Sequence, residues 1–218
     1  MNLNTVIFDM DGLLIDSEPL WNEAATLVFS DFGKKLSDEE YATTTGLRTS
    51  EFVSWWLKDY KFDDAELERA GNKIVDLVIE KIKANPQPLP GVKSIIQFFT
   101  ERKFKIGLAT SSPMQLVNTV AELLGIAPYL QAISSAENLE FGKPHPQVYL
   151  NCAALLKSSP LDCICFEDSF NGMIAVKAAR MKCVVVPVHS QQKDHKWAAA
   201  DLKLSSLQNF SELHLNFL

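Results

Sequence analysis

The stretch NTVIFDMDGLLIDSEPLW, residues 4–21, ends a short apolar run on one aspartate and places a second aspartate two positions later. Thr5 to Phe8 has the composition of a buried strand, whereas aspartate is a poor strand former and is costly to bury without a partner. Two carboxylates this close repel each other unless a cation lies between them, and oxygen ligands suit a hard ion such as magnesium. Asp9 and Asp11 therefore predict a metal or catalytic site at the end of the first strand, although an ordinary Asx turn would also explain DMDG alone.

Short apolar runs recur along the chain and alternate with helical patterns. Strands are expected at 5–8, 104–109, 132–134, 163–166 and 183–187, and helices at roughly 91–102, 113–124, 146–156 and 171–179. Strands that are apolar on both faces and separated by helices are typical of a parallel sheet covered by helices on both sides. We expect an α/β fold with a Rossmann-like parallel sheet, in which ligands bind outside the carboxyl ends of the strands.

Residues 16–87 interrupt this alternation, because they contain helical patterns and no convincing strand. The longest helical pattern covers residues 64–83. Four of the ten prolines lie at the two edges of the block, where they would stiffen the linkers. We expect residues 16–87 to form a small α-helical cap domain, inserted after the first strand of a core domain made of 1–15 and 88–218. A helical layer of the same domain is the alternative.

Three further polar clusters follow expected strands. Residues 110–112, TSS, precede a helix whose free N–H groups would bind phosphate, although Ser112 would also serve as an ordinary helix cap. Lys143, in FGKPHP, is either a phosphate-binding charge or a surface lysine. Glu167 and Asp168 form a second acidic pair at a strand end, which would complete an oxygen-only metal site with the first pair.

Composition narrows the classes of function. The 218 residues carry a formal net charge of −6 with no basic patch, so no nucleic acid is expected as a partner. No apolar run reaches about 20 residues and no basic amphipathic helix is present, so no membrane contact is expected. The N-terminus lacks a signal-peptide pattern, and the four cysteines lack metal-site spacing and are expected in the core. A cytoplasmic monomer is the default expectation.

The segments FDMDG, ATSS, KPHP and FEDSFNG occur in this order at expected strand ends. Together they resemble the four motifs of the haloacid dehalogenase-like (HAD) superfamily of aspartyl phosphohydrolases, and the resemblance spans the whole chain. The helical insert is similar to the C1-type cap of the subfamily that includes β-phosphoglucomutase. Other stretches look most like bacterial hexose-phosphate phosphatases, in particular the 2-deoxyglucose-6-phosphate phosphatase group. The resemblance implies hydrolysis of a small phosphorylated sugar through an aspartyl-phosphate intermediate.

The resemblance also implies a role for each residue of the motifs. Asp9 would be the nucleophile that attacks phosphorus. Asp11 would act as general acid toward the leaving sugar oxygen and then as general base toward water. Thr110, Ser111 and Lys143 would bind the transferring phosphate.

For the metal, the resemblance implies Mg²⁺ held by Asp9, the backbone carbonyl of Asp11 and Asp168, with help from Glu167. A phosphate monoester is an anion that repels a carboxylate nucleophile. Mg²⁺ and Lys143 would offset this repulsion and stabilise the charge on the transferring group.

Three other functions compete with hydrolysis. Dehalogenases of the superfamily lack the second acid of the first motif, whereas this chain has Asp11. β-Phosphoglucomutases resemble the chain more closely but carry a histidine on the first cap helix, where this sequence has Trp21, so water is favoured as the phosphoryl acceptor. A receiver-like, non-catalytic phosphate-binding module would have no reason for the general acid or the helical lid.

Substrate choice is expected in the cap and at its edge. Arg48 is a candidate substrate contact, or else a solvated arginine at a helix start. Trp21 and Glu18 are expected to face the site when the cap closes. Asn171 is expected to form a hydrogen bond with a residue that binds the metal, or else to start its helix. Trp55 and Trp56 are expected in the cap core, with one of them lining the pocket as the alternative.

Overall fold

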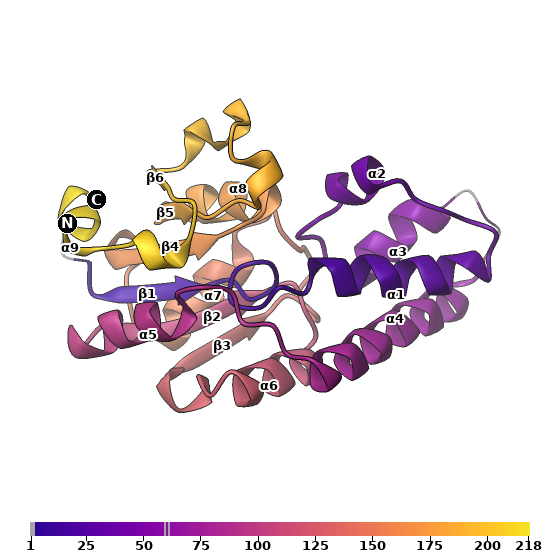
Figure 1. The fold of residues 1–218 in the computed structure, drawn as a ribbon, viewed down its shortest axis with the longest axis horizontal. Helices are drawn as coiled ribbons and strands as arrows, with labels where there is room; N and C mark the ends of the chain where they lie inside the picture. The colour runs from indigo at the N-terminus through magenta and orange to yellow at the C-terminus, as the bar shows by residue number, and fades with distance from the viewer. Residues whose placement is uncertain (1–2, 59, 61) are drawn as a thin grey trace.

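The structure is a computed structural model that describes residues 3–58, 60 and 62–218 (Figure 1). Within these residues six parallel strands form one sheet in the order β3-β2-β1-β4-β5-β6. The strands are β1 Thr5–Phe8, β2 Lys105–Thr110, β3 Ala132–Ser135, β4 Cys163–Glu167, β5 Lys182–Val185 and β6 Leu202–Lys203. From β1 the order runs to β2 and β3 on one side and to β4, β5 and β6 on the other, so the end of β1 lies at a topological switch point. The expected α/β fold is confirmed, and β6 was not predicted because two residues carry no detectable period.

Different helices cover the two faces of this sheet. On one face Val6 and Phe8 pack with α5 Val92–Glu101 and α6 Met114–Leu123. On the other face Ile7 packs with α7 Gln147–Leu155 and α8 Phe170–Ala178. The short α9, Glu212–Phe217, ends the chain. Because both faces of the sheet are buried, the central strands are apolar on both faces, and their polar residues lie mostly at the strand ends.

The four cysteines belong to the core cluster that contains Ile7, α7 and α8, and all four are free and buried. Burial raises the pKa of the thiols of Cys152 and Cys163 to about 12. Thiols that stay protonated are poor nucleophiles and poor metal ligands. The expectation that these cysteines are core residues is confirmed.

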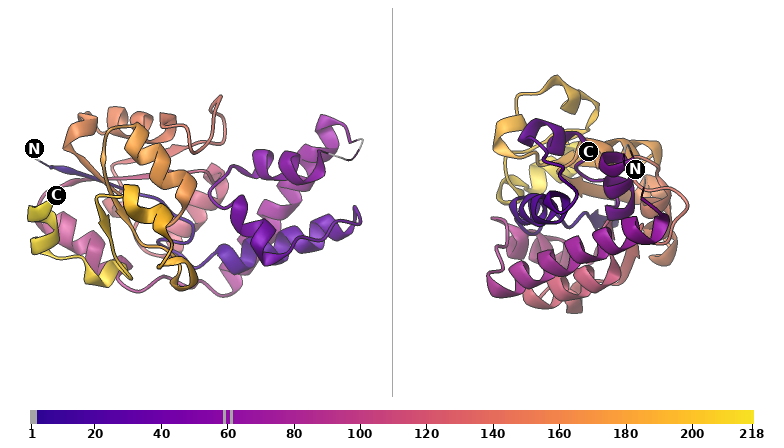
Figure 2. Two further views of the ribbon diagram at one scale, coloured as in Figure 1. Left: turned by 90° about the horizontal axis from the view of Figure 1, so that it is seen from above. Right: turned by 90° about the vertical axis from the view of Figure 1, so that its right-hand side faces the viewer.

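Helices α1 Glu18–Ser30, α2 Asp38–Thr43, α3 Thr49–Leu57 and α4 Asp64–Ala84 form a lobe beside the carboxyl ends of the strands (Figures 1 and 2). The two chain segments that lead into and out of this lobe are paired. The N–H of Asp16 donates to the carbonyl of Gln87 at 2.8 Å, and the N–H of Leu89 donates to that of Leu14 at 3.1 Å. We propose these paired segments as the boundary between a core domain, 1–15 plus 88–218, and a cap domain, 16–87.

The two adjacent tryptophans of the cap have different surroundings. Trp56 is partly buried and its indole N–H donates to Thr44 Oγ1 at 3.0 Å. Trp55 is 54% exposed, with the Lys58 ammonium 4.8 Å from the centre of its ring, so its assignment to the cap core was wrong. Adjacent helical residues point about 100° apart, and only one of the two tryptophans reaches the interior. None of the helices in the described part of the chain has the length and apolar character needed to span a membrane.

Asp201, just before the edge strand β6, forms hydrogen bonds with β5. Its contribution to the free energy of unfolding should depend on pH. Its Oδ2 accepts hydrogen bonds from the backbone N–H of Cys183 at 2.8 Å and from Lys177 Nζ at 2.6 Å. Partial burial opposes ionisation, but these donors and the charge of Lys177 hold the pKa of Asp201 below its usual value of 3.8. A depressed folded-state pKa contributes stability above the unfolded pKa and loses it as pH falls through the folded value.

We therefore expect Asp201→Ala to lower the free energy of unfolding by about 1–2 kcal/mol at neutral pH, since solvent still reaches the carboxylate. The difference from wild type should shrink below about pH 4. Urea unfolding at neutral and at acidic pH measures both values, with the exposed Asp31→Ala as the control. An equal loss at both pH values would contradict the electrostatic origin.

Candidate active site

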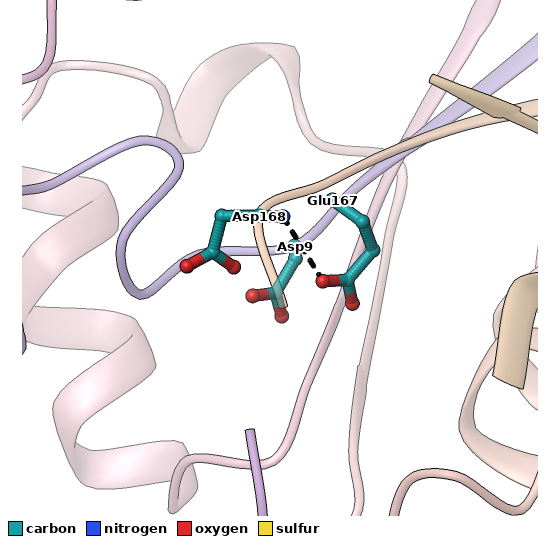
Figure 3. A group of neighbouring side chains, drawn as sticks. All are labelled: Asp9, Glu167 and Asp168. Carbon is teal, nitrogen blue, oxygen red and sulfur yellow. Dashed lines mark hydrogen bonds between the residues drawn. The ribbon is translucent and has the colours of Figure 1, made fainter. Parts of the chain in front are cut away.

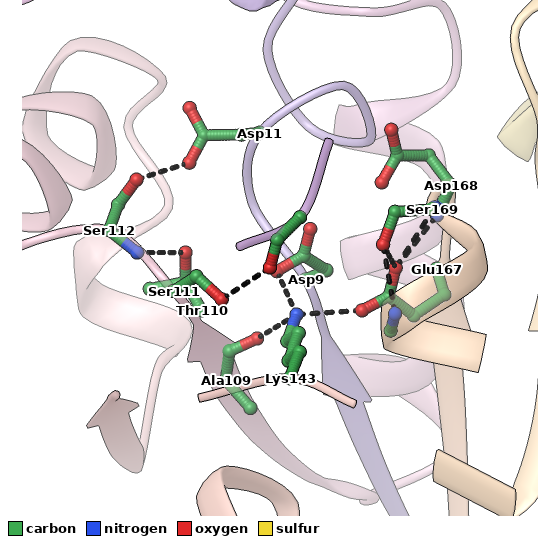
Figure 4. Close-up of polar contacts among 12 residues, drawn as sticks. Asp9, Asp11, Ala109, Thr110, Ser111, Ser112, Lys143, Glu167, Asp168 and Ser169 are labelled. Atoms are coloured by element: carbon green, nitrogen blue, oxygen red, sulfur yellow. Dashed lines mark hydrogen bonds and ion pairs between the residues drawn. The ribbon is translucent and has the colours of Figure 1, made fainter. Parts of the chain in front are cut away.

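The carboxyl ends of β1, β2 and β4 meet at one point of the sheet edge (Figure 4). Phe8 of β1 lies in register with Leu108 of β2 and with Phe166 of β4. Asp9 therefore leaves the sheet beside Thr110 and Glu167, which are the last residues of their strands. The sequence predicted this convergence from the strand ends alone, because parallel neighbours end at the same edge.

Lys143 enters this point from the loop between β3 and α7, where its peptide bond to Pro144 is cis. Its side chain is buried, and Nζ donates to Asp9 Oδ1 at 2.6 Å, to Glu167 Oε1 at 2.7 Å and to the carbonyl of Ala109 at 3.3 Å. Burial alone would lower the pKa of Lys143, but the two carboxylates outweigh it and raise the pKa. The lysine is therefore a fixed buried cation, and the alternative of a surface lysine is wrong.

Glu167 is fully buried, and donors occupy both of its oxygens. Oε1 accepts from Lys143 and from the hydroxyl of Tyr149, which lies at 2.5 Å. Oε2 accepts from the backbone N–H groups of Asp168 and Ser169 and from the Ser169 hydroxyl, at 3.0–3.1 Å. This arrangement indicates that Glu167 orients Lys143, while a direct bond from Glu167 to a metal stays a prediction. The hydrogen bond from Tyr149 was not predicted, because no motif of the sequence includes this residue.

Carboxylate oxygens of Asp9, Glu167 and Asp168 lie within 4.8 Å of one another (Figure 3). When all three are ionised, Lys143 balances only one of their charges. Burial raises the pKa of Asp9, which Lys143 lowers in part, and burial with the charge of Glu167 raises the pKa of Asp168. A divalent cation would relieve this excess of negative charge, and an all-oxygen set suits a hard ion. The residues present therefore fit a metal site of the magnesium type.

The carboxylate of Asp11 is held by three donors. Oδ1 accepts from the Ser17 hydroxyl at 2.7 Å and from Trp21 Nε1–H at 3.0 Å, and Oδ2 accepts from the Ser112 hydroxyl at 2.6 Å. The helix that follows Ser112 has Pro113 as its N-cap, so the interpretation of Ser112 as an ordinary helix cap was wrong. The contacts from Ser17 and Ser112 were not predicted, because neither serine has a distinguishing neighbour in the sequence.

A cavity of about 60 Å³ lies between the cap and the core, next to Asp9, Asp11 and Lys143. It is lined from the core by Asp9, Asp11, Thr110, Ser111, Ser112, Lys143 and Asp168, and from the cap lobe by residues that include Glu18, Trp21, Tyr41 and Thr45. Burial and then the charge of Asp11 raise the pKa of Glu18 to about 7. Glu18 and Trp21 both line the cavity, so they face the site as expected.

Thr110 and Ser111 line the cavity as expected, and each hydroxyl oxygen already takes part in one hydrogen bond within the protein. Thr110 Oγ1 accepts from the N–H of Ser112 at 3.0 Å, which leaves its own O–H to donate elsewhere. The hydroxyl of Ser111 donates to the carbonyl of Gly46 in the cap at 2.8 Å. Their roles as phosphate ligands stay predictions.

Arg48 and Asn171 bridge the two lobes and are not among the residues that line this cavity. The guanidinium of Arg48 donates to the carbonyls of Ala136 and Leu139 in the core. The amide of Asn171 donates to the carbonyl of Thr45 in the cap at 3.0 Å. Arg48 is thus no solvated helix-start residue, and a substrate contact by either side chain stays a prediction.

Comparison with known proteins agrees with this geometry. A family model described as haloacid dehalogenase-like hydrolase matches residues 3–180. Hexitol phosphatase B of Escherichia coli (strain K12) is 41% identical over 202 residues, which cover 92% of this chain and 91% of that protein. The phosphorylated carbohydrates phosphatase of Thermotoga maritima is 29% identical over 192 residues, which cover 86% and 87% of the two chains.

Among solved structures, a β-phosphoglucomutase from Clostridium difficile shares the fold with a TM-score of 0.88 at 24% identity, over 98% of this chain and 96% of that one. The family match includes the strands that carry Asp9, Thr110 and Glu167 and the loop that carries Lys143. This chain belongs to the haloacid dehalogenase-like hydrolase family.

Proposed function

We propose that this chain is a Mg²⁺-dependent phosphatase that hydrolyses phosphate monoesters of hexoses or hexitols through an aspartyl-phosphate on Asp9. The observation that carries the proposal is the buried Lys143 between Asp9 and Glu167, because a fixed cation beside a carboxylate at a strand end is suited to a phosphoryl group. The names of the hexitol and phosphorylated-carbohydrate phosphatases support the class of substrate. 2-Deoxyglucose 6-phosphate remains a candidate within that class.

In the proposed reaction an oxygen of Asp9 attacks phosphorus, and the bond from phosphorus to the sugar oxygen breaks. Asp11 gives its proton to the departing oxygen. Lys143 and the hydroxyl of Thr110 hold the oxygens of the transferring group. In the second step Asp11 takes a proton from water, which attacks phosphorus and frees Asp9 and inorganic phosphate. A bound Mg²⁺ supplies positive charge that offsets the repulsion between carboxylate and phosphate.

The cap would exclude bulk water from this chemistry. The cavity of about 60 Å³ is much smaller than the roughly 300–1,000 Å³ of typical small-molecule sites. A sugar phosphate does not fit within this cavity alone, and we propose that the cap moves away from the core to admit it. The paired segments at Asp16 and Gln87 are the proposed hinge for that motion, and lid motions of this kind often limit turnover.

Phosphoryl transfer between sugars is the alternative that the fold itself keeps open, since β-phosphoglucomutase has the same fold. Trp21 favours hydrolysis. Its indole N–H donates to Asp11, and an indole is a donor only, so it cannot exchange a proton with an incoming hydroxyl.

Phosphate release tests the proposal. We expect turnover of a hexitol phosphate, 2-deoxyglucose 6-phosphate and p-nitrophenyl phosphate with MgCl₂, loss of turnover with EDTA, and recovery when Mg²⁺ is restored. Formation of a sugar bisphosphate in place of free phosphate would favour transfer. A folded protein that releases no phosphate from any ester would favour a binding module. A cytoplasmic location and a monomeric state stay predictions.

A further inference from the structure

Glu18 lies at the first position of α1, where the chain enters the cap, and it lines the cavity above the catalytic groups. It also lines a neighbouring cleft of about 560 Å³ between the lobes. A Cβ built on Gly12 would lie 3.5 Å from Glu18 Cγ and 2.2 Å from Asp168 Oδ2, so the two acids face each other across this glycine. Glu18 is therefore placed where a substrate would extend from the reacting centre into the larger space.

The carboxylate of Glu18 has unused capacity to accept hydrogen bonds. Within the described residues its one hydrogen bond comes from the Thr45 hydroxyl, at 3.5 Å, which is the outer limit for such a contact. An ionised carboxylate can accept about four hydrogen bonds, and a protonated carboxyl group still accepts at its carbonyl oxygen. Glu18 is also outside the cluster of Asp9, Glu167 and Asp168, so neither the chemistry nor the metal site accounts for it.

A donor faces the same space. Tyr41 lines the cavity, and in the described part of the chain its hydroxyl forms no hydrogen bond. Burial, followed by the charges of Glu18 and Asp11, raises the pKa of Tyr41 well above its usual value, so the phenol keeps its proton. A sugar or polyol hydroxyl is both donor and acceptor, and an adjacent carboxylate and phenol match both of its functions.

We infer that Glu18 and Tyr41 form a recognition site for the hydroxyl groups of the leaving polyol, with Glu18 accepting and Tyr41 donating. The inference rests on the proposed function, since it assigns the part of the substrate that leaves with the oxygen protonated by Asp11. A site that hydrogen-bonds a substrate hydroxyl discriminates strongly against a substrate that lacks it, because its own polar groups are then left unpaired. Glu18 and Tyr41 are thus specificity-determining residues.

The test compares two substrates that share a phosphate but differ in hydroxyl groups, a hexitol phosphate and p-nitrophenyl phosphate. We expect Glu18→Gln to lower the ratio of kcat/KM for the hexitol ester to kcat/KM for the aryl ester by about 10- to 100-fold, mainly through KM. Tyr41→Phe should lower the same ratio by about 5- to 10-fold. Glu23→Gln, an isosteric change on the same helix at an exposed residue paired with Lys81, should leave the ratio at its wild-type value.

Other outcomes have separate meanings. Equal losses on both substrates, or a change in the Mg²⁺ concentration that half-activates Glu18→Gln, would overturn the inference and assign Glu18 to the chemistry or to the metal. An unchanged ratio in both variants, with thermal unfolding like that of wild type, would also overturn it. Failure of the wild-type protein to release phosphate from either ester would instead defeat the proposed function, and this inference with it.

Discussion

Asp9→Asn is expected to reduce the turnover of every phosphate ester by roughly 10⁴- to 10⁶-fold, the scale seen when an enzyme loses its covalent nucleophile. Asp9 Oδ1 accepts from Lys143 at 2.6 Å, which fixes the carboxylate at the end of β1. An amide of the same shape is not nucleophilic, so no aspartyl-phosphate can form. The fold should survive, because Lys143 keeps its ion pair with Glu167 at 2.7 Å and the buried excess of negative charge decreases.

Two measurements check this expectation. Phosphate release gives the loss of turnover, and mass spectrometry of acid-quenched protein shows whether a phosphoryl group is attached to the peptide that contains Asp9. Asp31→Asn, at an exposed residue of the cap, is the matched control for the substitution itself. Turnover of Asp9→Asn within tenfold of wild type, or a phosphoryl group found on another residue, would show that Asp9 is not the nucleophile.

The part of the site that the sequence predicted is the part that lies at strand ends. Asp9, Thr110 and Glu167 each close an apolar run, and a parallel sheet brings such ends together whatever the intervening loops do. The position of Lys143 followed from the prolines beside it, but its burial did not. Whether a lysine faces solvent or two carboxylates depends on other segments of the chain, which leave no periodic signal. Here they carry Asp9, 134 residues away, and Glu167, 24 residues away.

Other contacts that were not predicted join different elements of the fold. Tyr149 of α7 reaches Glu167 at the end of β4, and Arg48 of the cap reaches the carbonyl of Ala136 in the core. The pattern of apolar and polar residues shows which face of a helix or strand is buried. It does not show which polar group a side chain on that face will contact. The two adjacent tryptophans near the end of α3 show the same limit. Adjacent residues on a helix cannot share one face, and the sequence does not show which of the two is buried.

Asp11→Asn is expected to leave substrate binding close to wild type and to lower steady-state turnover by about 10²- to 10⁴-fold, the usual contribution of a general acid and base. The asparagine can keep the hydrogen bonds from Ser17 and Trp21 through its carbonyl oxygen. It loses the acceptor for the Ser112 hydroxyl, whose bond to Oδ2 measures 2.6 Å in the native protein. Above all it can neither give a proton to a departing sugar oxygen nor take one from water.

The two roles of Asp11 can be separated by the choice of leaving group. p-Nitrophenolate departs without a proton, so the variant should still form the aspartyl-phosphate from the aryl ester while its hydrolysis is slow. Rapid mixing should then show a burst of about one p-nitrophenolate per active site, followed by slow turnover. A hexitol phosphate should give no burst, because its leaving oxygen needs the proton. Asp31→Asn, at an exposed residue of the cap away from the site, serves as the control. A near-wild-type rate on the hexitol ester would remove Asp11 from both steps, whereas a slow first step on the aryl ester would mean that Asp11 acts by positioning Asp9 or the phosphate.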